Sequence, residues 1–289
     1  MTGPTRQRGD RPRGPRDRPA APEPLPGPVV DNHCHLDIAD GDWLPVQDAI
    51  ASATAVNVTR IVQVGCDLPG AAWAVETARQ HDELVAAVAL HPNEVPVLAA
   101  TGELDDAFAE IARLAVDPVV RAVGETGLDY FRTGEEGRPV QREGFGWHVD
   151  LARRLGKTLV IHDRDAHDDV LAVLDEVGVP DRWVMHCFSG DADFARRCLD
   201  RGAYLSFSGT VTFKNAPLLR EALAVAPLDR VLVETDAPFL TPVPYRGRPN
   251  ASYLIPHTVR AMAQVRGDRL EDLCQALEAN TFAAFGGAW

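Results

Sequence analysis

Two histidines stand one residue apart in the segment DNHCHLD, residues 31–37. The segment follows Val29 and Val30, a short apolar run typical of the start of a strand. In a strand, residues i and i+2 point to the same face, so His33 and His35 would converge on one point. Imidazole nitrogens arranged in this way suit a metal ion. The pair alone is a weak signal, because isolated motif matches often arise by chance.

Other histidines and carboxylates end further apolar runs. His91 follows the run 84–90, and Glu234 and Asp236 follow the run 231–233. Four of the nine histidines and two carboxylates fall at equivalent ends of five runs: His33, His35, Glu125, His162, His186 and Asp236. A buried structural role is the better interpretation for any single histidine. A shared site is the better interpretation for six residues at matching ends.

This set is too large for one tetrahedral ion and fits two divalent ions with a bridging carboxylate. We expect one ion on His33, His35 and Asp236, a second on His162 and His186, and Glu125 between them. Imidazole-rich ligation favours Zn or Mn, and Mg fits where substrate phosphates complete its shell. Such a centre activates a water for hydrolysis, with Glu125 and Asp236 as the catalytic residues and Asp236 as the candidate general base.

The elements that must position these residues alternate along the chain. Eight strand-like runs rich in Val, Ile and Leu occupy residues 29–35, 60–66, 84–92, 119–130, 157–164, 182–190, 203–209 and 230–240. Helical spacing occurs between them, at residues 71–80, 104–114, 141–155, 170–177 and 193–200. This pattern predicts an α/β fold, a single (β/α)8 TIM barrel, whose active sites lie at the carboxyl ends of the strands. An open doubly wound sheet is the alternative, but no G-x-G-x-x-G follows the first strand.

Residues 1–28 differ from the rest of the chain. They hold six arginines, three acids and few apolar residues, a composition that predicts a disordered tail before one barrel domain at residues 29–289. A weak nucleic-acid tether is the alternative role for this tail. The whole chain carries −13 and the tail +3, so residues 29–289 carry −16. A nucleic-acid substrate would therefore meet its positive charge in bound metal ions and a few arginines.

Cysteine usage and hydropathy bear on the compartment. The five cysteines are odd in number and form no C-x-x-C motif, which predicts reduced thiols. No apolar run approaches the length of a membrane span, and no apolar stretch follows the basic tail as in a signal peptide. We expect a cytoplasmic protein with no membrane partner, and we favour a monomer.

Seven sequence blocks resemble, in order and spacing, those of the TatD family of metal-dependent hydrolases: DNHCHLD, GETGLDYFRTG, QREGFGWHVDLARRLGKTLVIHDRDA, MHCFSG, YLSFSGTVTFKNA, VLVETDAPFLTP and PYRGRPNASYL. The resemblance covers about residues 29–285. It implies a TIM barrel of the amidohydrolase type and a divalent-metal-dependent deoxyribonuclease, often acting on single strands from the 3′ end. The metal ligands of the family carry over onto His33, His35, Glu125, His162, His186 and Asp236.

Three positions depart from the family pattern. Thr126 stands where the block usually reads GEIGLDY, Asn93 stands where a second histidine often follows the HP of strand three, and His148 replaces a frequent glutamine. None of the three changes removes a metal ligand. The change at Asn93 touches a loop near the predicted active site, so it bears on substrate detail rather than on metal binding.

Four arginines and one histidine are candidates for contacting substrate: Arg132, Arg164, Arg246, Arg248 and His91. Arg164 lies two residues after His162 and should share its face, although an ion pair with Asp163 or Asp165 is an equal alternative. The other arginines lie in loops after predicted strands, where barrels often bind phosphate and where a solvated loop is the alternative. Glu234 is a candidate to accept the second N–H of a ligand histidine.

The predicted two-ion centre indicates a hydrolase, and the resemblance to the TatD family implies a DNase of the 3′ exonuclease type that cleaves phosphodiester bonds, most often in single-stranded DNA. The alternative is a binuclear-metal hydrolase of another ester, amide or lactone in the same barrel, because a fold does not fix its substrate. A non-catalytic relic is disfavoured, because the predicted ligand set is intact.

Overall fold

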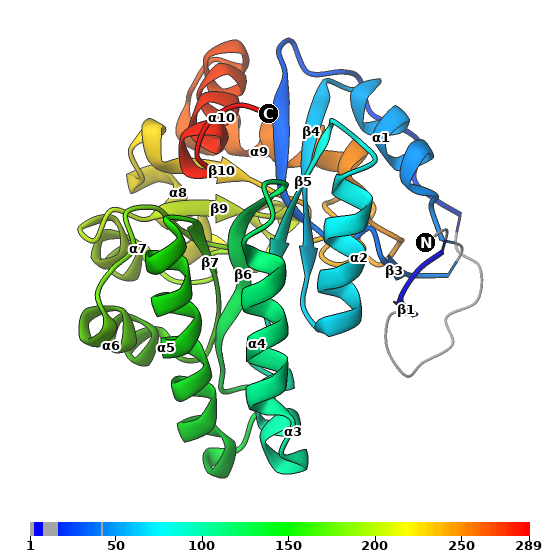
Figure 1. The fold of residues 1–289 in the computed structure, drawn as a ribbon. Helices are drawn as coiled ribbons and strands as arrows, with labels where there is room; N and C mark the ends of the chain where they lie inside the picture. Colours follow the sequence, from blue (N-terminus) through cyan, green and yellow to red (C-terminus); the bar gives the residue numbers. More distant parts are fainter. Residues whose placement is uncertain (1–2, 8–16, 42) are drawn as a thin grey trace.

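The computed structural model describes residues 3–7, 17–41 and 43–289. Eight parallel strands form one sheet in the order β10-β9-β8-β7-β6-β5-β4-β2 and are surrounded by helices (Figure 1). The strands are β2 (Val29–Cys34), β4 (Val58–Gly65), β5 (Leu84–Val88), β6 (Val120–Asp129), β7 (Thr158–Arg164), β8 (Trp183–Met185), β9 (Tyr204–Phe207) and β10 (Val231–Val233). Each falls inside or overlaps a predicted run, so the eight-stranded barrel is confirmed.

The barrel closes through the segment that follows β10. The backbone N–H of Asp236 donates to the carbonyl of His33 at 2.9 Å, and the N–H of His35 donates to the carbonyl of Ala237 at 2.8 Å. The buried Asp31 carboxylate accepts both the backbone N–H of Thr235, at 2.9 Å, and the hydroxyl of Thr235, at 2.6 Å. Closure therefore places Asp236 beside His33 of β2 and beside His35, which lies just past the end of that strand.

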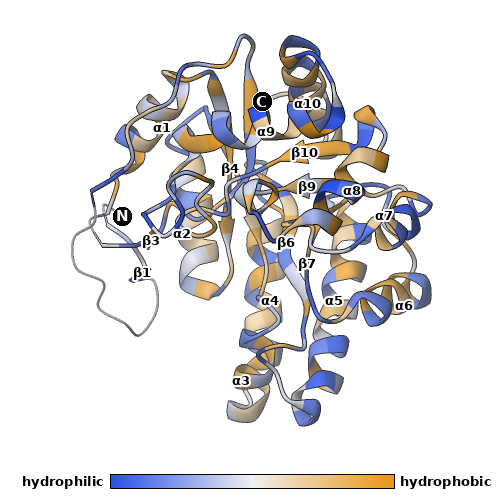
Figure 2. Ribbon diagram, turned by 180° about the vertical axis from the view of Figure 1, so that it is seen from behind, coloured by the Kyte–Doolittle hydropathy of each residue, from blue (hydrophilic) through white to orange (hydrophobic). Residues whose placement is uncertain are grey.

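Ten α-helices connect and cover the strands: α1 (Val46–Thr54), α2 (Leu68–Ala78), α3 (Glu94–Thr101), α4 (Leu104–Ala115), α5 (Arg138–Leu155), α6 (His167–Val177), α7 (Ala192–Leu199), α8 (Pro217–Val225), α9 (Ile255–Arg266) and α10 (Leu270–Ala284), counted over the described residues. In α4, Phe108 and Ile111 are buried while Asp105 and Asp106 lie in the first turn. This pattern is that of an amphipathic helix packed on a sheet. Figure 2 shows the same division, with hydrophobic colour concentrated on the strands and both colours on the helices.

Alternate strand residues fill the interior of the barrel. Val62 and Val64 of β4 belong to an inner cluster with Val85 and Val160, whereas Ile61 belongs to the larger layer under the helices. Phe285, which follows α10, joins the inner cluster and is 1% exposed. Its neighbour Ala284 accepts a hydrogen bond from the hydroxyl of Thr158, the first residue of β7. The C-terminal segment therefore fills the amino end of the barrel interior.

The described parts of residues 1–28 pack against the barrel. The short strand β1 (Arg6–Gln7) pairs in parallel with β3 (Ile38–Ala39). Leu25 is buried, and its backbone carbonyl accepts a hydrogen bond from Asn57 at 2.6 Å. Leu25 thus reaches the core, and a side chain of the barrel satisfies its carbonyl, while the disorder expected for the tail stays a prediction. Residues 8–16 lie outside the described residues, and the domain boundary at residue 28 stays a prediction.

No helix among the described residues combines the length and the hydropathy needed to cross a bilayer.

His148 of α5 is a fully buried histidine whose two ring nitrogens both have partners. Its Nδ1–H donates to the carbonyl of Gly144 at 2.7 Å, and its Nε2 accepts the backbone N–H of Leu90 at 3.1 Å. Phe108 and Trp147 contact the ring at T-shaped geometry. His148 is thus a core histidine in its neutral form, with both ring nitrogens hydrogen-bonded.

The pH dependence of stability should report this histidine. Burial lowers the pKa of His148 to about 4, against about 6.5 in an unfolded chain. The neutral ring therefore stabilises the fold fully above pH ~6.5, and about 3 kcal/mol is lost as the pH falls toward 4. We expect His148→Gln to lose less stability than the wild type between neutral pH and pH ~4.5, measured by urea unfolding. Equal losses in both proteins would contradict this assignment.

Candidate metal centre

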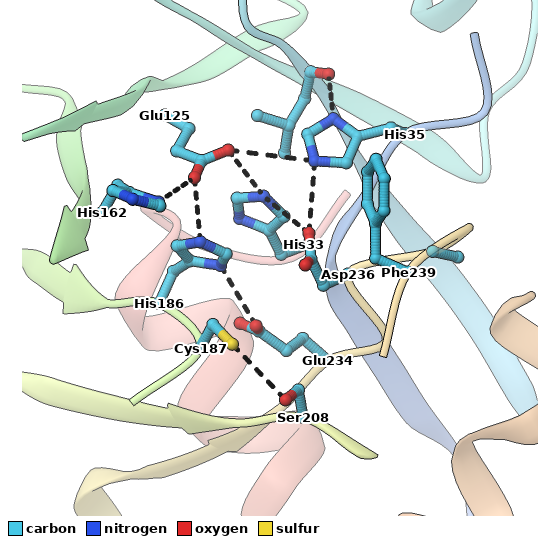
Figure 3. A network of polar contacts seen from close by, with 12 residues as sticks. His33, His35, Glu125, His162, His186, Cys187, Ser208, Glu234, Asp236 and Phe239 are labelled. Carbon is cyan, nitrogen blue, oxygen red and sulfur yellow. Dashed lines mark hydrogen bonds and ion pairs between the residues drawn. The ribbon is translucent and has the colours of Figure 1, made fainter. Parts of the chain in front are cut away.

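Glu125 of β6 lies at the middle of a cluster of histidines at the carboxyl ends of the strands (Figure 3). Its Oε1 lies 2.6 Å from Nδ1 of His162, 3.0 Å from Nε2 of His186 and 3.6 Å from Nε2 of His91. Its Oε2 faces the other side, 3.5 Å from Nε2 of His33 and 3.8 Å from Nε2 of His35. The two oxygens of one carboxylate thus face two separate sets of imidazoles.

Asp236 completes the second side of the cluster. Its Oδ1 lies 3.3 Å from Nε2 of His35 and 3.9 Å from Nε2 of His33. Asp236 follows β10 by three residues and has a positive φ of 54°, a backbone conformation that is uncommon for a residue with a side chain. His186 likewise lies one residue past β8, followed by Cys187 with a φ of 43°. These two groups are therefore aimed by irregular backbone rather than by strand alternation.

A close approach of two strands sets the distance between Glu125 and His162. Gly127 of β6 pairs with His162 of β7, and it has a φ of 144°. A Cβ at this position would lie 2.0 Å from the carbonyl oxygen of His162. Only glycine fits both requirements, so Gly127 allows β6 and β7 to approach where they carry their functional side chains.

Three groups within the described residues bring potential ligand atoms within 4.8 Å of one another: His33, His186 and Asp236; His33, His35 and Glu125; and His91, Glu125 and His162. The geometry brings together all six predicted ligands and adds His91. Both ring nitrogens of His33 are buried and lack a hydrogen-bond partner, as does Nε2 of His162. Buried, unpaired imidazole nitrogens beside carboxylates fit the donor set of divalent ions such as Zn or Mn.

Two histidines are oriented by contacts on their far side. Nδ1–H of His35 donates to the carbonyl of Val64 at 3.0 Å, which leaves Nε2 directed at the cluster. Nδ1 of His186 lies 3.1 Å from Oε1 of Glu234, and Oε2 of Glu234 accepts the hydroxyl of Ser206 at 2.5 Å. Such contacts fix the tautomer and the ring orientation of metal-binding histidines. This contact agrees with the role predicted for Glu234, which is to accept the second N–H of a histidine whose other nitrogen faces the cluster.

The electrostatics of the cluster keep its carboxylate ionised. Burial alone would raise the pKa of Glu125, but the neighbouring His186 and His91 and a hydrogen bond from His162 hold that pKa well below its usual range. Burial and the nearby His186 lower the pKa of His33, which favours the neutral, metal-binding form. Burial opposes the charge of His162, but its contacts with Asp129 and Glu125 raise its pKa to about 9.

One set of contacts beside the cluster was missed by sequence reasoning. Oδ2 of Asp129 lies 3.5 Å from Nε2 of His162 and accepts the side-chain N–H of Asn93 at 3.0 Å. Nδ1 of His91 accepts the backbone N–H of Asn93 at 3.1 Å. The signal in the sequence was that Asp129 stands four residues after Glu125 on the same run. Asn93 therefore supports the two histidines that lie on the Oε1 side of Glu125.

A thiol also lies against the cluster. Cys66 Sγ is 3.4 Å from Oε2 of Glu125 and donates to it. The sequence predicts only that the five cysteines are reduced thiols, and nothing in it indicates this contact. Cys187, beside His186, has its Sγ 3.5 Å from the hydroxyl of Ser208 and points away from the cluster (Figure 3). All five cysteines are free thiols.

The four candidate arginines lie on loops or strand ends at the same end of the barrel. The guanidinium of Arg164 stacks 3.8 Å from the ring centre of Phe131, and that of Arg246 lies 4.3 Å from the ring centre of Phe213. Arg248 lies over Tyr245 at 5.9 Å. The alternative ion pair of Arg164 with Asp163 is not seen, because Asp163 contacts His167 at 2.6 Å. Substrate contact by these arginines, and by Arg132 and His91, stays a prediction.

Metal removal should destabilise the protein. We expect EDTA to lower the thermal midpoint and Mn or Zn to restore it, because ions that bind only the folded chain stabilise it by mass action. Metal analysis should find about two ions per chain in the wild type and fewer in Glu125→Ala. His257→Ala is the control, because His257 lies outside the cluster. An unchanged midpoint after full metal removal would rule out a structural contribution from the ions.

The contact between Glu234 and His186 should tune affinity without supplying a ligand. We expect Glu234→Gln to weaken metal binding about 10- to 100-fold, because the amide is a poorer acceptor for the imidazole N–H. Competition with a fluorescent chelator measures this constant directly. Glu110→Gln, on the surface of α4, is the control and should bind metal as the wild type does. Equal affinities in all three proteins would remove the role assigned to Glu234.

Comparison with known proteins agrees with this geometry. The TatD related DNase family matches residues 30–286. The chain is 46% identical over 266 residues to the uncharacterized metal-dependent hydrolase TatD of Mycobacterium tuberculosis, covering 90% of this chain and 99% of that protein. It is 40% identical over 255 residues to the uncharacterized metal-dependent hydrolase YcfH of Escherichia coli K12, covering 87% and 93% of the two chains.

A solved structure shares both fold and sequence. The TatD homologue YJJV of Escherichia coli superposes with a TM-score of 0.80 at 26% identity, covering 90% of this chain and 98% of that one. A TatD family hydrolase of Entamoeba histolytica, at 18% identity and a TM-score of 0.76, shares the fold. The chain belongs to the TatD family of metal-dependent hydrolases, with the amidohydrolase-like TIM barrel of that family.

Proposed function

We propose that the chain is a divalent-metal-dependent deoxyribonuclease that hydrolyses phosphodiester bonds of single-stranded DNA, shortening it from the 3′ end. The observation that carries the proposal is the position of Glu125, whose two oxygens face two sets of imidazoles. A carboxylate shared between two ion sites is the usual arrangement for hydrolysis of phosphate esters. The match to the TatD related DNase family supports DNA as the substrate class.

The residues of the site would have two roles, which are to bind the metal ions and to activate the attacking water. His33, His35 and Asp236 would hold one Mg, Mn or Zn ion, His162 and His186 the other, and Glu125 would bridge them. The ions would supply a low-pKa water and polarise the phosphoryl oxygens. The side chain of Asp236 is 16% exposed, against 6% for Glu125 and none for Glu234, so Asp236 is the carboxylate that solvent and substrate reach most easily. It is therefore placed to orient the attacking water and to accept its proton.

The substrate would be held at the edge of the site. Arg132, Arg164, Arg246 and Arg248 lie at the carboxyl end of the barrel and would bind the phosphates, with His91 contacting the reacting group. The body carries a large negative charge, so these arginines and the ions supply the local positive charge for DNA. We further propose that the protein acts as a cytoplasmic monomer, in line with its free thiols.

A second candidate is a binuclear-metal hydrolase that acts on another ester, an amide or a lactone. The observation that favours it is the charge of −16 on residues 29–289, which disfavours extended contact with a phosphate backbone. The same metal centre could serve such a substrate, because the fold does not select it.

A nuclease time course separates the two candidates. Metal-stripped protein receives Mg, Mn or Zn with end-labelled single- and double-stranded DNA, and we expect metal-restored, stepwise shortening of the single strands. Glu125→Ala and Asp236→Ala should each reduce the rate about a thousandfold or more, because several kcal/mol of transition-state stabilisation are lost. Glu110→Ala should retain full activity. Activity retained in both site variants, or turnover of small esters with none of DNA, would reject the DNase.

A further inference from the structure

We infer that the ring of Phe131, backed by Arg164, is a stacking platform for an unpaired nucleobase of the strand bound at the metal centre. The inference rests on the proposed function and adds to it a residue that contacts the base of the DNA rather than its phosphate. Phe131 was not among the candidate site residues of the sequence.

The exposure of Phe131 is unusual for an aromatic residue. Its side chain is 64% exposed, and it is the single aromatic among the six large exposed hydrophobics of the described residues. The other five are aliphatic: Val97, Val116, Leu218, Val225 and Val243. A phenyl ring left in water forgoes the stabilisation of burial, so an exposed ring beside a functional centre points to a ligand that covers it.

Phe131 is held by the two strands that carry the centre of the metal site. It lies two residues beyond the end of β6, the strand of Glu125, while Arg164 ends β7, the strand of His162. The two strand ends are joined by a hydrogen bond from the N–H of Tyr130 to the carbonyl of Arg164, at 2.9 Å. The ring is therefore positioned by rigid elements at the rim of the site, as a specific platform must be.

Arg164 supports the ring and keeps its charge available. Its guanidinium lies 3.8 Å from the ring centre, a cation–π distance. Although Asp163 and Asp165 flank it in sequence, no carboxylate lies within ion-pair distance of Arg164 in residues 3–7, 17–41 and 43–289. Asp163 pairs instead with His167, at 2.6 Å. The stack thus offers an aromatic face for a base and an unpaired cation for the adjoining phosphate.

The surroundings favour a base over a protein partner. The exposed residues that follow Phe131 in the chain offer it no further apolar side chain: Arg132, Gly134, Glu135 and Glu136. Protein interfaces need a contiguous buried core, whereas single-stranded nucleic acids are bound by isolated rings with nearby positive charge. Arg246 over Phe213 repeats the arrangement on the loops after β10 and β9. A single strand crossing the mouth would meet both stacks.

Substitution of Phe131 tests the platform. The probes are a short single-stranded oligonucleotide, the same oligonucleotide with abasic nucleotides at its 3′ end, and bis(p-nitrophenyl) phosphate, which has no nucleobase. We expect Phe131→Ala in the metal-loaded protein to raise KM for the normal oligonucleotide about tenfold or more. Its kcat and its metal content should stay at wild-type values. Phe131→Trp should restore KM, and the abasic oligonucleotide should show no difference between wild type and Phe131→Ala.

A control variant and a binding measurement keep the test decisive. Val116→Ala removes an equally exposed side chain, 63% exposed, at the opposite end of the barrel, and should leave every value unchanged. Affinity for a phosphorothioate oligonucleotide, read by fluorescence anisotropy, tests the platform even if the wild type cleaves no DNA. Weaker binding in Phe131→Ala alone would support the platform. Equal KM and equal affinity in Phe131→Ala and wild type would overturn it. The platform would also be overturned if Phe131→Ala raised KM for bis(p-nitrophenyl) phosphate as much as it raised KM for the oligonucleotide.

Discussion

The hydrogen bonds that join residues 33–35 to residues 236–237 are the constraint on which the site depends. We call these contacts the seam, because they join the segment after β10 to the first strand of the barrel. The bonded backbone groups belong to His33, His35, Asp236 and Ala237. The carboxylate of Asp31 reinforces the seam by accepting two hydrogen bonds from Thr235. Because His33, His35 and Asp236 are candidate ligands, the backbone contacts that close the barrel also bring these side chains together.

The centre concentrates groups that a protein core otherwise avoids. Glu125, Glu234 and His186 are buried together, and they remain tolerable because each carboxylate oxygen faces a nitrogen or a hydroxyl. Both ring nitrogens of His33 and Nε2 of His162 are exceptions, since they have no hydrogen-bond partner. A divalent ion would satisfy such a nitrogen better than any neighbouring side chain does. The burial of unpaired imidazole nitrogens therefore supports the binding of a divalent ion at the centre.

Sequence patterns predicted the architecture and the convergence of six ligands, because strand periodicity and the shared end of a parallel barrel are local and topological rules. They did not predict the contacts of Asp129, Cys66 or Phe131. These contacts depend on which loop atoms meet once the barrel has closed. Residue spacing in the sequence does not determine such long-range contacts. His186 and Asp236 were placed at strand ends, yet both lie past the strands on irregular backbone. The packing of Leu25 and the hydrogen bond to its carbonyl were not predicted either, because they are long-range contacts.

The phenyl ring of Phe285 has a consequence for the movement of a polymer. Together with Ala284 it fills the amino end of the barrel interior, where the packed side chains leave no passage. The packed interior therefore offers no route to the centre from the amino end of the barrel. A DNA strand could not thread through the barrel as it can through a ring-shaped clamp. Under the proposed exonuclease function, each shortened end would leave and return at the carboxyl end of the barrel, so contacts there would set how many nucleotides are removed per encounter.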